Sequence, residues 1–173
     1  NNIVLRSDLV STASKFTERA NALRYQLVEY QTNMNQEGKN QVDQINDIVD
    51  QIRHYNELIQ KYEATGESAN DYRDSRNLLL DQLSTYVNVE SYEEVDGTVS
   101  IYAEGQFLLE SNVQHRLTTA NESETSKLLK PVWEMGGDFF LRGELSYSSE
   151  NDTDTGSLRG LLVARGKSKT TYL

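Results

Sequence analysis

The first third of the chain is organised by apolar residues that recur at alternating steps of three and four. The first run of this pattern consists of Leu9, Ala13, Phe16, Ala20, Leu23, Leu27, Tyr30 and Met34. The second run consists of Ile45, Ile48, Ile52, Tyr55, Ile59 and Tyr62. This spacing lines one face of a helix with apolar side chains, and it is typical of a long helix that packs against a partner helix.

We define the rod packing seam by ten positions of the two runs: Leu9, Phe16, Leu23, Leu27, Tyr30, Met34, Ile45, Ile48, Ile52 and Ile59. A polar stretch around Gly38 separates the runs, and two steps of four follow one another there. Such a stutter relaxes a supercoil without ending the helix. The pattern therefore predicts one helix over Leu9–Tyr62, about 80 Å long at ~1.5 Å per residue. The alternative, an αα-hairpin that turns near Gly38, stays open at this point.

Downstream of the long helix, the apolar spacing predicts a shorter helix over 69–85 and then changes to the alternation of β-strands. Alternation begins at Val87, and Asp96-Gly97 lies between two alternating runs. This pair predicts a hairpin, because a type I′ turn requires positive φ at both central residues. Glu104-Gly105 marks a second turn. Further strands are predicted over 107–109, 113–118, 128–134 and 139–147, and Pro131 indicates an edge strand.

The C-terminal part holds an acidic segment without periodicity and then returns to helical spacing. Residues 148–156 predict an exposed loop, and helical spacing resumes at Ser157. We therefore predict an α+β fold, in which a long α-helical rod (a coiled-coil-like helix bundle) carries an appended small, mostly antiparallel β domain. The predicted parts are residues 1–86 for the N-terminal part of the helical rod domain, residues 87–156 for the β domain, and residues 157–173 for the start of a returning rod helix.

Composition excludes several classes of function. The net charge is −10 and the pI about 4.7, which disfavours binding to nucleic acid or to an anionic membrane. The absence of cysteine excludes disulfides, thiol nucleophiles and Cys-ligated zinc. No apolar run reaches the ~20 residues that span a bilayer, and the first residues do not resemble a signal peptide. The chain starts without Met and stops at Tyr172-Leu173, so we expect a fragment of a longer protein.

Residues with catalytic or metal-binding potential do not combine into a motif. His54 and His115 are the only histidines, and neither has a motif partner nearby in the sequence. The stretch from Gly160 to Ser168 has one residue too many between its glycines for a phosphate-binding P-loop. We therefore predict no catalytic residue, no metal site and no cofactor, and we do not expect an enzyme.

The second predicted helix carries the most specific motif of the chain. Residues 69–84 read ANDYRDSRNLLLDQLS, residues 96–99 read DGTV, and residues 156–165 read GSLRGLLVAR. These stretches resemble bacterial flagellar hook-associated proteins of the hook–filament junction type. The motif residues in the helix are Asn70, Asp71, Arg76, Leu79, Asp81, Gln82 and Leu83, and the hairpin turn is Asp96 with Gly97. Arg159, where the family usually has Gly, and Gly166 depart from the pattern and bear on the packing of the last helix.

The resemblance implies a structural component of the flagellum, an adaptor that joins hook and filament and self-assembles through helical rod domains. The implied partners are the hook subunit, further hook-associated proteins, copies of itself, and an export chaperone that binds outside this segment. It also implies export by the flagellar type III apparatus without a cleaved signal peptide, and an extracellular location. The residues alone also allow a different class, a coiled-coil adaptor or adhesin-like binding module on the bacterial surface.

Overall fold

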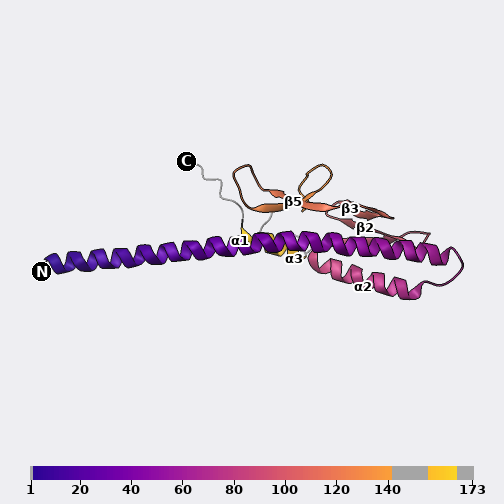
Figure 1. The fold of residues 1–173 in the computed structure, drawn as a ribbon, viewed down its shortest axis with the longest axis horizontal. Helices are drawn as coiled ribbons and strands as arrows, with labels where there is room; N and C mark the ends of the chain where they lie inside the picture. Colours follow the sequence, from indigo (N-terminus) through magenta and orange to yellow (C-terminus); the bar gives the residue numbers. More distant parts are fainter. Residues whose placement is uncertain (1, 142–155, 167–173) are drawn as a thin grey trace.

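The computed structural model of the chain describes residues 2–141 and 156–166. A single long helix, α1 (Asn2–Glu63), runs the whole length of the molecule, and every other element lies beside its C-terminal half (Figure 1). Helices α2 (Asn70–Tyr86) and α3 (Ser157–Arg165) lie along one side of α1, and the strands lie along another side (Figure 1). The architecture is α+β, as the spacing predicts.

Helix α1 is continuous through Gly38, so the hairpin alternative is wrong. The glycine serves a packing role, because α3 crosses α1 at this point. A Cβ atom built on Gly38 would lie 3.4 Å from Cδ2 of Leu161 and 3.8 Å from Cδ2 of Leu162. The predicted helix was also too short at its start, since α1 begins at Asn2 rather than at Leu9. The chain then reverses through Gly66, whose φ is +84°, and α2 returns antiparallel along α1.

The strands form two antiparallel units. The first is a four-stranded sheet in the order β1-β2-β3-β4, with strands β1 (Val89–Glu93), β2 (Val99–Ala103), β3 (Gln106–Glu110) and β4 (Val113–Gln114). The second is the pair β5 (Leu117–Asn121) and β6 (Leu129–Trp133). Pro131 lies in β6, and its carbonyl accepts the N–H of Phe140 at 3.0 Å. Of the strand predicted over 139–147, Phe139 forms a single bridge to Val132, and residues 142–147 lie outside the described residues. Most of the predicted loop 148–156 also lies outside them.

The hairpin at Asp96-Gly97 exists, but its turn is not the predicted type I′. Only Gly97 has positive φ, at +81°, and its N–H donates to the carbonyl of Glu94 at 3.0 Å. This is a three-residue loop with a left-handed glycine at its end. Both central residues have positive φ at the second turn instead, Glu104 at +48° and Gly105 at +85°. The type I′ turn is therefore the one that joins β2 to β3.

A single hydrophobic core joins the three helices to β2, β3, β5 and β6. Among its most deeply buried members are Ile45 and Ile52 of α1, Leu83 of α2, Leu109 of β3 and Leu158 of α3. The core therefore contains residues from both sides of position 87, where the sequence predicts the boundary between the rod domain and the β domain. The β elements fold onto the rod helix rather than around a separate core.

Three asparagines of α1 attach the strands to the helix. Asn56 donates from Nδ2 to the carbonyls of Val99 and Ser111 at 2.9 Å each, and its Oδ1 accepts the N–H of Val99 at 3.0 Å. Asn46 forms the same kind of pair with Leu117, at 2.8 Å from Nδ2 to the carbonyl and 2.9 Å from the N–H to Oδ1.

The third asparagine, Asn35, accepts the N–H of Leu129 at 2.6 Å and donates to the carbonyl of Lys127 at 3.3 Å. Because these positions are separated by about three helical turns each, all of them face the strands. Each of the three hydrogen-bonded pairs satisfies backbone groups that a helix backbone cannot reach. We call Asn35, Asn46 and Asn56 the asparagine ladder.

Replacing Gly38 with Ala should raise the stability of the fold. The helical backbone accepts alanine, the added methyl group meets Leu161 at an ordinary contact distance, and Ala is better than Gly in a helix by about 1 kcal/mol. The midpoint of thermal unfolding, followed by circular dichroism, should increase. The matched variant Gly97→Ala should lower it, because a Cβ there would lie 2.8 Å from Oε2 of Glu63 at positive φ. A lower midpoint for Gly38→Ala would contradict the close but permissive packing of α3.

Replacing Asn56 with Ala should destabilise the fold by about 3 kcal/mol, because it leaves several buried backbone groups without hydrogen bonds. The expected fall in Tm is roughly 6 to 12 °C for a chain of this size. The control is Asn33→Ala, an exposed asparagine of the same helix, which should change stability by no more than about 0.5 kcal/mol. Equal effects of the two variants would show that the ladder contributes nothing specific.

Candidate functional site

The N-terminal half of α1 extends away from the rest of the molecule as a bare helix (Figure 1). The rod packing seam is exposed there: Phe16 keeps 74% of its surface, Leu9 71% and Leu23 57%. Leu27 and Tyr30 are also exposed, and Met34 is half-buried at the edge of the body. Within the described residues this half of the seam lacks the packing partner that its spacing predicts.

The C-terminal half of the seam is buried by the rest of this chain. Ile45, Ile52 and Ile59 are completely buried, and Ile48 keeps only 8% of its surface. The steps from Leu27 through Gly38 to Ile45 keep the same side of the helix, since residues seven or eleven apart lie nearly above one another. The bare seam is thus the direct continuation of the face that α2 and α3 cover.

Helix α3 lies at the border between the covered and the bare half. At its start, the Ser157 hydroxyl donates to Oε1 of Gln41 at 3.3 Å. At its end, the carbonyl of Arg165 accepts from Nε2 of Gln31 at 3.3 Å. Helix α3 therefore runs antiparallel to α1, and its C-terminal end points along the bare half.

Two buried arginines hold α3 against both β units. Arg159 pairs with Glu104 in the β2–β3 turn at 3.2 Å, and both side chains are about nine-tenths buried. Arg165 pairs with Glu122 after β5, and its guanidinium also donates to Oδ1 of Asn35 at 3.0 Å and to the carbonyl of Leu129. Burial lowers the pKa of Arg165, and the Glu122 carboxylate opposes this effect. Arg159, where the sequence departs from the family pattern, therefore has a packing role in this chain.

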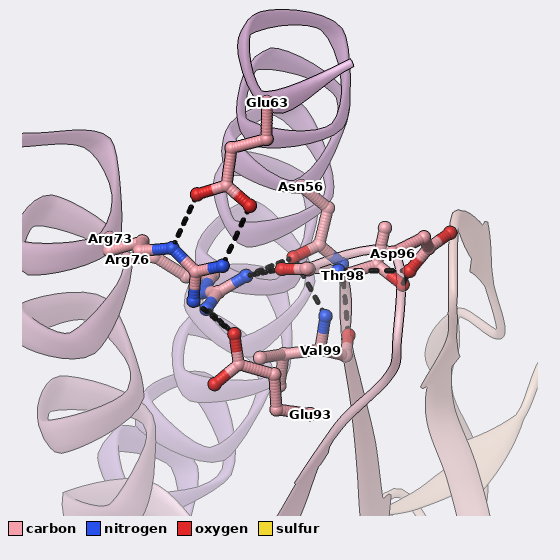
Figure 2. A network of polar contacts seen from close by, with 9 residues as sticks. Asn56, Glu63, Arg73, Arg76, Glu93, Asp96, Thr98 and Val99 are labelled. Carbon is pink, nitrogen blue, oxygen red and sulfur yellow. Dashed lines mark hydrogen bonds and ion pairs between the residues drawn. The ribbon is translucent and has the colours of Figure 1, made fainter. Parts of the chain in front are cut away.

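The other end of the body, near the α1–α2 turn, is held by a second polar network (Figure 2). The Arg76 side chain is 2% exposed, and its Nη1 donates to Oδ1 of Asn56 at 3.1 Å and to the carbonyl of Gly97 at 2.6 Å. Glu93 of β1 lies 3.6 Å from the same guanidinium. Burial lowers the pKa of Arg76, but the nearby Glu93 carboxylate favours the charged form. Arg76 thus joins α2, α1 and the β1–β2 hairpin.

Arg73 extends this network toward solvent. Its guanidinium forms two parallel hydrogen bonds to Glu63, at 2.7 and 2.8 Å, and a further ion pair with Glu93 (Figure 2). The hydrogen bonds to Arg73 hold the pKa of Glu63 below its ordinary value of 4.5. Next to it, Asp96 accepts from Thr98 and from Gln60, at 2.7 and 2.9 Å, which lowers the pKa of Asp96.

The motif residues of α2 divide into two groups. Arg76, Leu79 and Leu83 are buried and connect α2 to the core. The remaining members are exposed: Asn70, Asp71, Asp81 and Gln82. Asp96 and Gly97 lie in the hairpin loop, and Gly97 is buried against Glu63 and Ile59. The motif is therefore partly a packing motif and partly a surface feature.

Chemistry beyond packing is not visible in the part of the chain that the structure describes. His54 is exposed on α1, and His115 is half-buried between β4 and β5. No cluster of three or more His, Cys, Asp or Glu side chains in residues 2–141 and 156–166 could hold a metal ion. None of the helices described there is both long and apolar enough to cross a membrane.

The sequence did not predict the asparagine ladder or the carboxylate partners of the two arginines of α3. Asn35, Asn46 and Asn56 are spaced by eleven and ten residues, which places them on one side of the long helix. That spacing is the signal that could have revealed them. Arg159 and Arg165 offered no comparable signal, because their carboxylate partners are distant in the sequence.

Replacing Glu63 with Gln should remove a stabilising ion pair that depends on pH. Because the folded pKa of Glu63 is depressed, the pair stabilises fully above about pH 4.5 and loses its effect as the pH falls through the folded pKa. The difference in Tm between wild type and Glu63→Gln should be largest at neutral pH and should shrink as the pH is lowered below about 4.5. The control Glu67→Gln, at an exposed position of the turn, should differ little from wild type at any pH. A difference that stays constant with pH would contradict the role of this ion pair.

Comparison with known proteins agrees with this geometry. The family model for the flagellar hook-associated protein FlgK helical domain matches residues 1–172. The chain is 27% identical over 169 residues to flagellar hook-associated protein 1 of Bacillus subtilis, covering 93% of this chain and 33% of the relative. Its fold is similar to the flagellar hook junction protein FlgK of Burkholderia pseudomallei, with a TM-score of 0.59, 25% identity, and coverage of 80% of this chain and 25% of that chain.

The chain thus spans about a third of the length of the curated relative and a quarter of the solved one. The match nevertheless extends over nearly every residue of this chain, including the long helix and the motif in α2. The chain belongs to the FlgK family of flagellar hook-associated proteins, within its helical domain.

Proposed function

We propose that this chain is a segment of a structural adaptor that joins the flagellar hook to the filament. The observation that carries the proposal is the bare half of α1, where a heptad seam of large apolar side chains is exposed in a protein of this family. A folded body that exposes such a stripe in line with its own core face requires a partner. The body, which includes the β elements, remains beside the other half of the helix.

The proposed partner of the bare seam is another helix, because three-four spacing matches the knobs-into-holes packing of helices. Flagellar axial proteins would supply it: the hook subunit, further hook-associated proteins, another copy of this protein, or a different part of the same longer protein. Two basic side chains flank the seam in this half, Arg19 and Arg24. They would favour a partner helix with acidic flanking positions.

The proposal includes the location of the protein. As a hook-associated protein it would be exported through the flagellar type III apparatus, without a cleaved signal peptide, and would act outside the cell in the flagellum. An export chaperone would bind outside this segment. The role is mechanical rather than catalytic, since the family is structural. Membership in this family does not favour the alternative of an adhesin-like binding module.

The test replaces three exposed seam residues together: Leu9→Asp, Phe16→Asp and Leu23→Asp. In the source bacterium, with the full-length protein, this variant should abolish motility and leave filament subunits in the medium, because the adaptor cannot assemble. The purified chain should unfold at the wild-type temperature, since these side chains are exposed and lie outside the core. Swimming on soft agar and immunoblots of the medium measure the first result, and circular dichroism measures the second.

The matched control carries three aspartates on the opposite side of the same helix: Ser7→Asp, Ser14→Asp and Asn21→Asp. All three positions are exposed and follow the same heptad spacing. This control should swim like wild type. Normal motility of the seam variant would refute assembly through the bare seam, and loss of motility in both variants would show that charge in this half, rather than the seam, is decisive.

A further inference from the structure

The four-stranded sheet has one face on the core and one face turned away from α1. Alternation along the strands places Val99, Ile101 and Leu109 on the core side, and all three are buried. Tyr102 of β2, which follows Ile101, therefore points outward and is half-buried. The two faces differ sharply in chemistry.

Three aromatic rings cross the outward face from strand to strand. Tyr92 of β1 pairs with Ser100 of β2, so it lies diagonally next to Tyr102. Tyr102 pairs with Phe107 of β3, and their rings meet edge to face at 5.2 Å. Tyr92 keeps 50% of its surface and Phe107 keeps 37%. We call Tyr92, Tyr102 and Phe107 the aromatic row.

The segment that builds this sheet, residues 88–114, contains no Lys, Arg or His. It contains the carboxylates Glu90, Glu93, Glu94, Asp96, Glu104 and Glu110. Arginines from neighbouring elements form ion pairs with two of these carboxylates. Arg73 and Arg76 go to Glu93, and Arg159 goes to Glu104. The segment is thus strongly one-sided in charge.

Three of the other carboxylates lie on the outward face with the aromatic row. Glu90 accepts the hydroxyl of Tyr92, and Glu94 accepts the hydroxyl of Ser100 at 3.2 Å. Glu110 follows the core-facing Leu109 and is exposed. Within the described residues, the ion pairs found on this sheet involve none of these three carboxylates. Exposed ring faces and carboxylates at this spacing are complementary to ammonium or guanidinium groups.

We propose that the outward face of the four-stranded sheet binds a segment of another polypeptide chain that carries lysine or arginine side chains. The cationic groups would lie over the aromatic row and pair with Glu90, Glu94 and Glu110. This surface is separate from the bare seam of α1, and the proposal does not depend on the chain's place in the flagellum.

The test uses the whole chain and a synthetic peptide of alternating threonine and lysine, labelled for fluorescence anisotropy at low ionic strength. The variant Glu90→Gln, Glu94→Gln and Glu110→Gln keeps the shape of each side chain and removes its charge. It should weaken binding of the lysine peptide by about tenfold, the combined effect of several exposed ion pairs. The variant Tyr92→Ala with Phe107→Ala should weaken it by several-fold, and added salt should weaken it in the wild type.

The matched control, Asp43→Asn, Asp47→Asn and Asp74→Asn, removes the same charge from exposed positions on the helices and should bind like wild type. A peptide of alternating threonine and glutamate should not bind. Thermal unfolding of each variant establishes that it is folded. Changes in the amide chemical shifts of the wild type on adding the peptide locate the surface that binds it. Equal losses of peptide affinity in both triple variants would indicate attraction to net charge alone and would overturn the proposal. Absence of lysine-peptide binding to the wild type would also overturn it, as would chemical-shift changes that lie away from the aromatic row.

Discussion

A helix satisfies its own backbone groups, so the hydrogen bonds that it can offer to a neighbouring strand come from its side chains. In this chain the asparagine ladder supplies them. Asn46 and Asn56 each donate to a strand carbonyl and accept a strand N–H, as another strand would do, and Asn35 accepts the N–H of Leu129 in β6. The amide group is short enough to reach the strand while the apolar residues beside it still form the core. Without these pairs, the strands would bury polar backbone against a helix that cannot satisfy it.

The positions of the other elements follow from this attachment. Once the strands lie along α1, Gly97 is brought against Glu63 and Ile59, and its carbonyl becomes the acceptor for Arg76. At the other end, the β2–β3 turn and the segment after β5 present carboxylates to Arg159 and Arg165 of α3. Buried arginines are tolerated here because each pairs with a carboxylate, and Arg165 also donates to Asn35 and to the carbonyl of Leu129. The core and these ion pairs therefore depend on the same alignment of helix and strands.

The long helix and its apolar face could be predicted from spacing, because a helix repeats its contacts every few residues. The sequence also contained the signals for both hairpins, but it assigned the type I′ geometry to Asp96-Gly97. The structure places that geometry at Glu104, a residue that adopts positive φ beside a glycine and pairs with Arg159 across the fold. Interactions of this kind join residues that are far apart in the chain, and local patterns do not encode them. The partner of Leu9, Phe16 and Leu23 could not be predicted either. The spacing of a seam indicates that a partner helix is needed, but it does not indicate which chain provides that helix.

The continuity of α1 through Gly38 also has a mechanical consequence. The helix enters the body from one end and passes every other element before it stops at Glu63. A pull along its axis would slide the helix past the strands, and the ladder at Asn35, Asn46 and Asn56 would resist this displacement together, as bonds loaded in parallel. A pull across the axis would open the same contacts one after another. The fold is therefore best suited to bear tension along the direction in which the bare half of the helix points.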